Sequence, residues 1–178
     1  MTLLSDDRLV DQLSQDYTPM AVDQDAFRAA MGQVCTPVSV VSVMDGARPH
    51  ASTVSAFASQ SMEPPMVLVS LATSSYLLSL LDNGRRFGLN VLGADQTDLA
   101  LRFAGKGADK FAGIEWALRE GVPTLPGSPV WMACHVTDRF KSGDHVVVCG
   151  TVLAVEATRV QPLTYHGHSF GTHGRLSG

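Results

Sequence analysis

The sequence has little charge, and what charge it has is scattered. Only 17% of its 178 residues are charged, and Asp and Glu outnumber Lys and Arg by 17 to 13. No segment gathers basic side chains into a stripe of the kind that follows a phosphate backbone. The composition therefore argues against nucleic acid as a partner. A weakly charged surface also favours burial of part of it against a second subunit, so we expect a homodimer.

Long hydrophobic runs are missing as well. No apolar segment approaches the roughly 20 residues that a membrane-spanning helix needs. The N-terminal segment MTLLSDDRLVDQLSQDY carries an early acidic pair and lacks the continuous apolar core of a secretory signal. We therefore expect a cytoplasmic protein without a membrane partner.

Cysteine is scarce, with Cys35, Cys134 and Cys149 widely separated and no C-x-x-C pair. Each lies in or beside an expected strand, which favours reduced, buried thiols over a disulfide framework or a zinc site. His166 and His168 could share one face of a strand, but no Cys, Asp or Glu lies beside them in sequence. We expect solvated histidines there and no metal site.

Several familiar motifs are absent. The sequence contains no G-x-G-x-x-G and no G-x-x-x-x-G-K-[ST], so any nucleotide is held without those phosphate-binding loops. It also lacks a nucleophile elbow and any sequence signature of a Ser-His-Asp or Cys-His set. Hydride transfer is consistent with these absences, because it needs two flat rings in contact rather than a strong protein base.

The residues that are present predict many short strands. Pro37–Met44 alternates Val with Ser, and Asp45–Gly46 is a strong turn signal. We expect the next strand to begin near His50, after a slightly long hairpin loop. Met66–Leu71 is a continuous apolar run, typical of a strand that is covered on both faces.

Two longer alternating segments, Val130–Phe140 and His145–Val155, predict a pair of long strands joined at Gly143–Asp144. Gly121–Pro129 is expected to be irregular. Helices are few. They are predicted over Asp25–Met31, from Ser74 or Ser75 to Leu81, and from a cap at Asp95 through Phe103 to Gly105.

This pattern indicates a mainly β fold, a closed or nearly closed antiparallel barrel with a few helices. Strands do not alternate regularly with helices, which disfavours a doubly wound parallel sheet. Residues 1–22 form an expected N-terminal extension, with a helix over Asp7–Gln15. Residues 23–178 form the expected domain.

Ser52–Ala56 is rich in small hydroxyl residues. Such a strand can lay its backbone against the edge of a flat ring, and Thr53 and Ser55 point to one face and can add hydroxyl donors. The alternative is a plain edge strand. Composition alone leaves both open.

Four segments together resemble the short-chain flavin reductases, the reductase components of two-component flavin monooxygenases. The resemblance runs from about Phe27 to Phe170. It rests on H-x-x-T-x-S-x-F at His50–Phe57, on S-x-x-P-P at Ser61–Pro65, on F-A-x-K-x-x-D-K-F at Phe103–Phe111, and on Gly143-Asp144-His145.

The resemblance implies a flavin-binding split barrel of antiparallel Greek-key type. It also implies that the backbone of Thr53, Val54, Ser55 and Ala56 faces the flavin ring. The junction at Ala72, Ser74 and Ser75 then lies near the flavin phosphate, where helix N-terminal N–H groups suit an anion. This chain departs from many relatives there, because no Lys or Arg occurs between Pro64 and Asp82.

Two further sites follow from the resemblance. Lys110 would supply charge to a phosphate, and Phe111 would pack on the flavin or on an adenine. The alternative for this loop is that Lys106 only supports the C-terminal dipole of the preceding helix. His145 would lie beside the nicotinamide and flavin, where its imidazole could position the nicotinamide or tune the charge of reduced flavin. It is the candidate catalytic residue.

The implied function is that of an NAD(P)H:flavin oxidoreductase. It would transfer hydride from NADH or NADPH to FMN or FAD and supply reduced flavin to a separate monooxygenase. The sequence leaves both the flavin and the nicotinamide open. The main alternative is a flavin-binding carrier without its own NAD(P)H oxidation, and a ligand-free interaction barrel is a third. A pyridoxine-phosphate-like substrate is disfavoured, because the chain has no basic cluster suited to that phosphate.

Overall fold

The computed structural model describes residues 21–107 and 109–175. Contacts divide the chain between Gln33 and Val34 into two units, which are described separately. The first unit contains helix α2 (Gln24–Gly32), where the Asp23 carboxylate accepts a 2.9 Å hydrogen bond from the Ala26 N–H. The helix expected at 7–15 lies outside the described residues, and the domain boundary at residue 22 stays a prediction.

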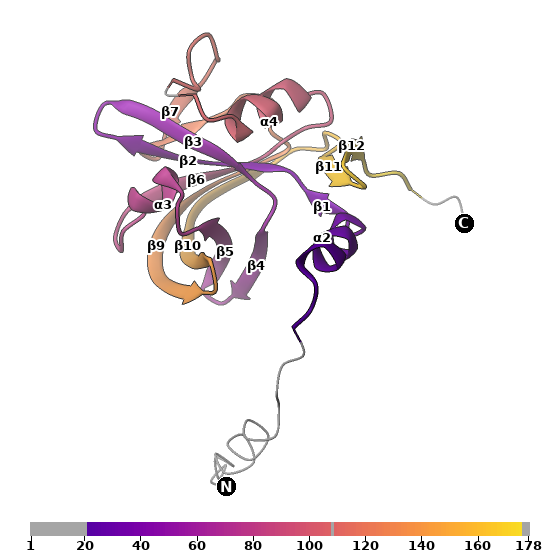
Figure 1. Ribbon diagram of the computed structural model, residues 1–178. Helices are drawn as coiled ribbons and strands as arrows, with labels where there is room; N and C mark the ends of the chain where they lie inside the picture. Colours follow the sequence, from indigo (N-terminus) through magenta and orange to yellow (C-terminus); the bar gives the residue numbers. More distant parts are fainter. Residues whose placement is uncertain (1–20, 108, 176–178) are drawn as a thin grey trace, which may run out of the picture. The chain divides into compact units, whose positions relative to one another are not determined.

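The second unit is built on one seven-stranded sheet in which every neighbouring pair is antiparallel (Figure 1). The strand order is β3-β2-β6-β9-β10-β5-β4. In chain order the strands are β2 (Ser39–Asp45), β3 (Arg48–Val54), β4 (Phe57–Met62), β5 (Pro65–Ala72), β6 (Arg86–Val91), β9 (Val130–Ser142) and β10 (His145–Ala157).

The two edges of this sheet meet. β3 and β4 are the edge strands, yet only Ser55 and Ala56 separate them in the chain. In a flat sheet the edges would lie roughly 29 Å apart, at about 4.8 Å for each of six steps. The chain from Val54 to Phe57 can span at most about 11 Å. The sheet therefore curls into a barrel whose edges meet at a seam, Ser55–Ala56, where the Ser70 N–H donates to the Ala56 carbonyl at 2.8 Å.

Smaller elements cover the barrel. A three-stranded sheet contains β1 (Thr36–Pro37), β11 (Leu163–His166) and β12 (Ser169–Thr172), and a hairpin contains β7 (Ala117–Arg119) and β8 (Val122–Thr124). The helices of this unit are α3 (Tyr76–Ser79) and α4 (Thr97–Ala104). The expected mainly β, antiparallel fold is confirmed. Within the described ranges no helix is long and apolar enough to cross a membrane.

Some local expectations are wrong. Asp45 pairs with Arg48, so β3 begins two residues before His50 and the turn is tight, with Gly46 at a φ of 58°. Val122–Thr124 is a strand rather than irregular, because it pairs with β7. Helix α3 ends at Ser79, two residues before the expected Leu81. Helix α4 has Gln96 rather than Asp95 at its N-cap.

The burial of β5 and of one cysteine also differs from expectation. In β5 the residues Val67, Val69 and Leu71 are buried, but the alternate residues are only half-buried, so one face alone is fully covered. Ser70, the one polar residue of the run, lies on this half-buried face. Cys134 and Cys149 are buried as expected, whereas Cys35 is exposed. Burial raises the pKa of the Cys134 thiol to about 12.

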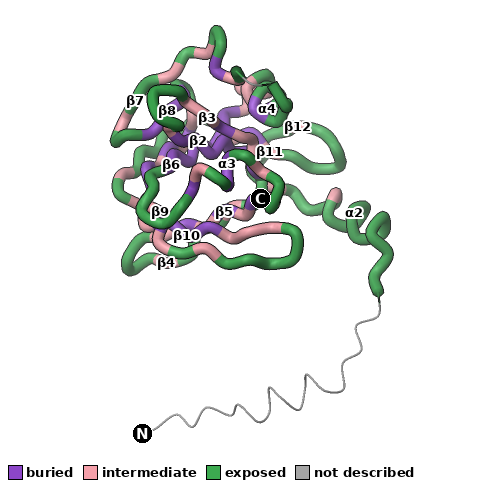
Figure 2. Tube along the Cα trace, turned by 60° about the vertical axis from the view of Figure 1, so that its left-hand side comes forward, coloured by how far each residue is buried: buried purple, intermediate pink, exposed green. Residues whose placement is uncertain are grey.

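The core fills the barrel from several strands at once (Figure 2). Phe87 on β6 and Val41 on β2 are completely buried there, and Val148 on β10 packs in the same cluster. Gly150 lies at a register shift of β10, and a Cβ added there would stand 2.6 Å from Phe87 Cε1 and 3.3 Å from Cys134 Cβ. The close approach of β10 to the Phe87 ring therefore requires glycine.

Replacing Gly150 with alanine is expected to destabilise the protein by about 1–3 kcal/mol, because the buried ring has no free space into which to move. The melting temperature should fall by roughly 2–12 °C. Gly171→Ala is the matched control, since a Cβ on that strand glycine would meet nothing nearer than Thr164 Oγ1 at 3.5 Å. Equal melting temperatures for the two variants in thermal unfolding would show that the Phe87 contact does not constrain β10.

Candidate functional site

The seam places the predicted ring-contacting segment at an open edge. Thr53 and Val54 end β3, and the exposed Ser55 and Ala56 lie beyond it. Within the described chain β3 pairs only with β2, so every second backbone N–H and C=O of this strand faces away from the ladder. Two carbonyls of β3 are nevertheless occupied, because Ala51 accepts from Lys110 and Val54 accepts from Ser39 Oγ, and the contact of this segment with a flavin stays a prediction.

The Thr53 hydroxyl has a different immediate role from the expected one. Its Oγ1 donates to the carbonyl of Ala100 in α4 at 2.7 Å, which ties the helix to the edge strand. Only its lone pairs remain for a ligand. Sequence spacing does not show this bond, because 47 residues separate the two partners.

Lys110 closes the other end of α4. Its ammonium donates to the carbonyl of Phe103 at 2.8 Å and to that of Ala51 in β3 at 3.3 Å. The carbonyl of the last helical turn thus receives the support that the sequence alternative gave to Lys106. Burial lowers the pKa of Lys110. Two of its three N–H donors are used, which leaves one for a ligand.

The loop after α4 is held by its own polar groups. The Asp109 carboxylate accepts from the N–H groups of Phe111 at 3.2 Å and Ala112 at 3.0 Å, and Arg102 donates to the Ala112 carbonyl at 2.8 Å. This loop turns the Phe111 ring inward, where it is 6% exposed and packs edge-on against Phe103 and Trp116. Phe111 is therefore mainly a core residue, and part of its surface lines a pocket.

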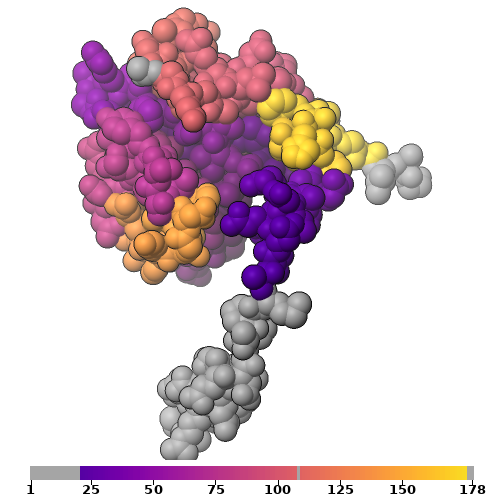
Figure 3. Space-filling view, in the orientation of Figure 1, coloured from indigo at the N-terminus to yellow at the C-terminus, as the bar shows by residue number. Residues whose placement is uncertain are grey.

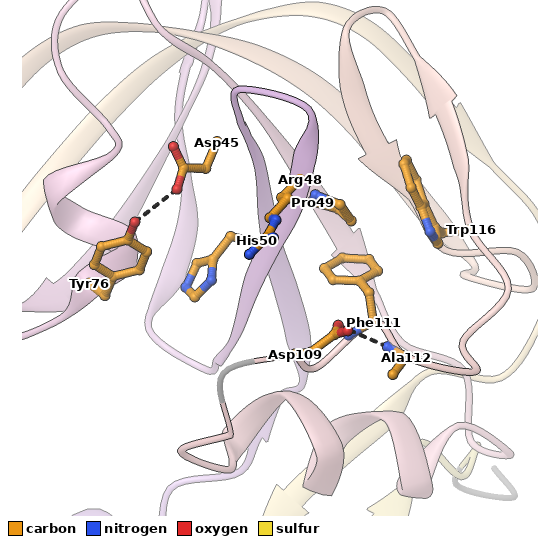
Figure 4. A pocket seen from close by; sticks show the side chains of 9 residues that line it. All are labelled: Asp45, Arg48, Pro49, His50, Tyr76, Asp109, Phe111, Ala112 and Trp116. Atoms are coloured by element: carbon orange, nitrogen blue, oxygen red, sulfur yellow. Dashed lines mark hydrogen bonds between the residues drawn. The ribbon is translucent and has the colours of Figure 1, made fainter.

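Two adjoining pockets open beside this loop. The first has a volume of about 540 Å³, and Figure 4 shows its lining: Asp45, Arg48, Pro49, His50, Tyr76, Asp109, Phe111, Ala112 and Trp116. The second has a volume of about 520 Å³ and is lined by His50, Ser52, Tyr76, Ala104, Gly105, Lys106, Gly107 and Lys110. His50 and Tyr76 belong to both, so these two side chains form the boundary between the pockets.

Tyr76, at this boundary, contacts both Asp45 and His50. The Tyr76 hydroxyl donates to Asp45 at 2.8 Å, and the His50 ring stands edge-on to Tyr76 at 4.9 Å between centroids (Figure 4). The bond to Asp45 raises the pKa of Tyr76. Burial, and then the charge of Lys110, lower the pKa of His50, which favours its uncharged imidazole. Sequence analysis missed Asp45 and Tyr76 as site residues, because no spacing relates the turn to the short helix.

The junction after β5 and the predicted catalytic histidine lie side by side. His145 pairs with Ala72 across the ladder, and the Thr73 N–H donates to the Asp144 carbonyl at 2.9 Å. Figure 3 shows the segment around α3 beside the β9–β10 turn. The Asp144 carboxylate bonds the His145 ring nitrogen Nδ1 at 2.8 Å, which lowers the pKa of Asp144.

Ser74 and Ser75 precede a helix of only four residues, and Ser75 makes no side-chain capping bond. The helix-terminal anion site expected here is therefore weak. Since Ser70 contacts the seam and Ala72 follows two residues later, the seam, the junction and His145 gather near one end of β5. Of the predicted site residues, Phe111 lines the first pocket and Lys110 lines the second. The other predicted site residues line neither pocket.

Comparisons with known proteins identify the family of this chain. A family model described as "Flavin reductase like domain" matches residues 31–174. The chain is 43% identical to the actinorhodin polyketide dimerase of Streptomyces coelicolor, over 76% of this chain and 78% of that protein. It is 38% identical to an NADH:riboflavin 5'-phosphate oxidoreductase of Streptomyces pristinaespiralis, over 89% and 93% of the two chains.

A third relative is the reductase subunit of a flavin-dependent monooxygenase of Mycobacterium tuberculosis, 36% identical over 82% of this chain and 80% of that one. Among solved structures, the NADH:FAD oxidoreductase of Streptomyces globisporus, in complex with NAD and FAD fragments, superimposes with a TM-score of 0.79 at 27% identity. That match covers 89% of this chain and 98% of the other. The chain therefore belongs to the flavin reductase-like domain family.

Proposed function

We propose that this protein is an NAD(P)H:flavin oxidoreductase. NADH or NADPH gives up a hydride, FMN or FAD takes that hydride and a proton, and oxidised nicotinamide and reduced flavin leave. The observation that carries the proposal is the gathering of the seam, the β5 junction and His145 at one end of a barrel whose family model matches residues 31–174.

The flavin ring is proposed to lie along the seam, with its polar edge toward the backbone of Thr53–Ala56 and with Ala72 beside it. The open edge of β3 supports this, since its outward backbone groups have no strand partner in the described chain. Ser52, which directly precedes this segment, lines the second pocket. A ligand could therefore continue from the seam into the pocket.

The flavin phosphate is proposed to lie between Lys110 and the Ser74–Ser75 hydroxyls. Tyr76 lines the second pocket and directly follows these serines, and Lys106 and Lys110, from the loop after α4, line the same pocket. Because the four-residue helix α3 offers little of a helix dipole, positive charge from the lysine loop is the main support for an anion here.

His145 is proposed to hold the nicotinamide against the flavin. Its Nδ1 is bonded to Asp144, which fixes the ring orientation and leaves Nε2 for a ligand. The flavin, when bound, supplies the hydride-accepting chemistry, and the chain contributes position and contact rather than a nucleophile.

Two partners belong to the proposal. A homodimer is supported by large apolar side chains exposed on the sheet, among them Met62 on β4, Phe140 on β9, and Leu153 and Val155 on β10. A separate flavin-dependent monooxygenase would receive the reduced flavin, in line with the Mycobacterium tuberculosis relative.

The test is NADH and NADPH oxidation at 340 nm by the purified protein, with and without FMN, FAD or riboflavin. We expect oxidation that depends on added flavin, with a preference that identifies the physiological flavin and nicotinamide. Flavin that binds but is not bleached by either nicotinamide would support the carrier alternative and overturn the reductase. The measurement matters because one relative with 43% identity is named for a different reaction.

A further inference from the structure

The His50 imidazole has no polar partner in the described part of the chain. The ring is half-buried and packs edge-on against Tyr76 (Figure 4), and neither of its nitrogens takes part in a hydrogen bond there. A neutral imidazole offers one donor and one acceptor, and a charged imidazole offers two donors. Because His50 lines both pockets, these nitrogens are available to a ligand in either of them.

The two pockets differ in charge. The lining of the second pocket contains Lys106 and Lys110 and, among the described residues, no Asp or Glu. The lining of the first pocket has two carboxylates, Asp45 and Asp109, and one arginine. Clustered positive charge attracts anions, so of the two pockets that His50 lines, the second is the one suited to an anion.

The backbone of β3 places His50 next to Lys110. Ala51 directly follows His50, and its carbonyl accepts a 3.3 Å hydrogen bond from the Lys110 ammonium. Side chains alternate along a strand, so His50 and Ser52 lie on one face of β3 and the buried Ala51 lies on the other. Both His50 and Ser52 line the second pocket. The histidine and the lysine therefore approach the same space from two different elements.

The charged groups around His50 act in opposite directions. Burial and then the charge of Lys110 lower the pKa of His50, and the carboxylate of Asp45 raises it by less. The titratable or charged residues that share a pocket with His50 are Asp45, Arg48, Tyr76, Lys106, Asp109 and Lys110. A phosphate in the second pocket would add about two negative charges beside the ring. Opposite charge favours the charged form of a histidine, so the bound phosphate would raise its pKa.

We propose that His50 is a third cationic contact of the flavin phosphate, beside Lys106 and Lys110, and that it takes up a proton from solvent when the phosphate binds. The imidazolium then donates a hydrogen bond to a phosphate oxygen. Riboflavin has no phosphate and makes no such contact. This inference rests on the proposed flavin site and not on hydride transfer from NADH.

The first test is fluorescence titration of the flavin-free protein and of His50→Gln with FMN and with riboflavin. Glutamine keeps a polar side chain but cannot be protonated. The Kd for FMN should rise about 5- to 13-fold at about pH 6.5, the difference between a hydrogen bond to a charged group and a neutral one. The Kd for riboflavin should change by less than about 2-fold, which also shows that the variant is folded.

His166→Gln is the matched control. It makes the same change at an exposed histidine of β11, in the separate small sheet, and should leave both dissociation constants unaltered.

The second test is the pH dependence of the same titrations. Charged His50 strengthens FMN binding fully below the pKa it has in the free protein, and this gain is lost as pH rises through the higher pKa it has in the complex. The Kd of His50→Gln divided by that of the unchanged protein should therefore fall toward one between about pH 6 and about pH 9. The titration of FMN itself is common to both proteins and cancels in this ratio.

Calorimetry in two buffers of different ionisation enthalpy counts the protons directly. Near neutral pH the unchanged protein should take up about 0.5 to 1 more proton per bound FMN than His50→Gln does. Equal proton uptake in the two proteins would overturn the proposal.

Two results of the affinity titrations would also overturn it. If His50→Gln binds FMN like the unchanged protein at every pH, water is the partner of the ring. If FMN and riboflavin lose affinity equally, His50 supports the pocket rather than the phosphate. Neither result bears on hydride transfer, which the NADH assay measures separately. A protein that prefers FMN to riboflavin through His50, yet oxidises neither nicotinamide, would refute the reductase alone.

Discussion

Phe111→Ala is expected to destabilise the protein by about 3–5 kcal/mol, the usual loss when a buried phenylalanine is truncated. The ring is 6% exposed and joins Phe103 and Trp116 in the cluster between α4 and the barrel. Its removal leaves a cavity between two edge-on aromatic contacts. The melting temperature should fall by roughly 6–20 °C in thermal unfolding.

Phe27→Ala is the matched control, because that ring is 59% exposed on α2 and should cost less than about 1 kcal/mol. A similar loss of stability in both variants would mean that Phe111 is not a core residue. The milder Phe111→Leu separates packing from ligand contact. If the ring also stacks on the flavin or on an adenine, as the resemblance implies, this change should weaken flavin binding by roughly 2- to 13-fold, the usual range for one aromatic pair.

Strand periodicity predicted most of the fold, because alternation is a local property that each strand carries in its own residues. The two long strands β9 and β10 and the turn at Gly143–Asp144 follow from it. Periodicity does not predict which strands pair. The closure at Ser55–Ala56 depends on β4 reaching β5 and on five further pairings, so the seam could not be located from local patterns.

The predicted site residues were found by motif, and the structure groups them in a way that motifs do not show. Ala72 and His145 are 73 positions apart in the sequence, yet they pair across the ladder. Lys110 lines the second pocket, but its ammonium also donates hydrogen bonds to the carbonyls of Phe103 and Ala51. Its positional role could not be predicted, because it requires α4 and β3 to pack together first.

His145→Ala is expected to slow the reduction of bound flavin by roughly 10- to 100-fold, the size of effect that follows when a reacting group loses its positioning contact. Flavin affinity should change by less than about 3-fold, since the proposed ring and phosphate contacts come from the seam and from Lys110. Stopped-flow mixing of the flavin-loaded protein with NADH measures the first quantity, and fluorescence titration with FMN or FAD measures the second.

His166→Ala is the matched control, because it removes an exposed imidazole from β11, which belongs to a separate small sheet, and it should leave both quantities unchanged. Asp144→Asn tests the orientation of the ring, since it weakens the 2.8 Å contact to His145 Nδ1 while the imidazole stays. We expect an intermediate loss of reduction rate. If His145→Ala reduces flavin as fast as the unchanged protein, the histidine has no part in hydride transfer. If flavin binding falls in step with the rate, its contribution is to the flavin and not to the nicotinamide.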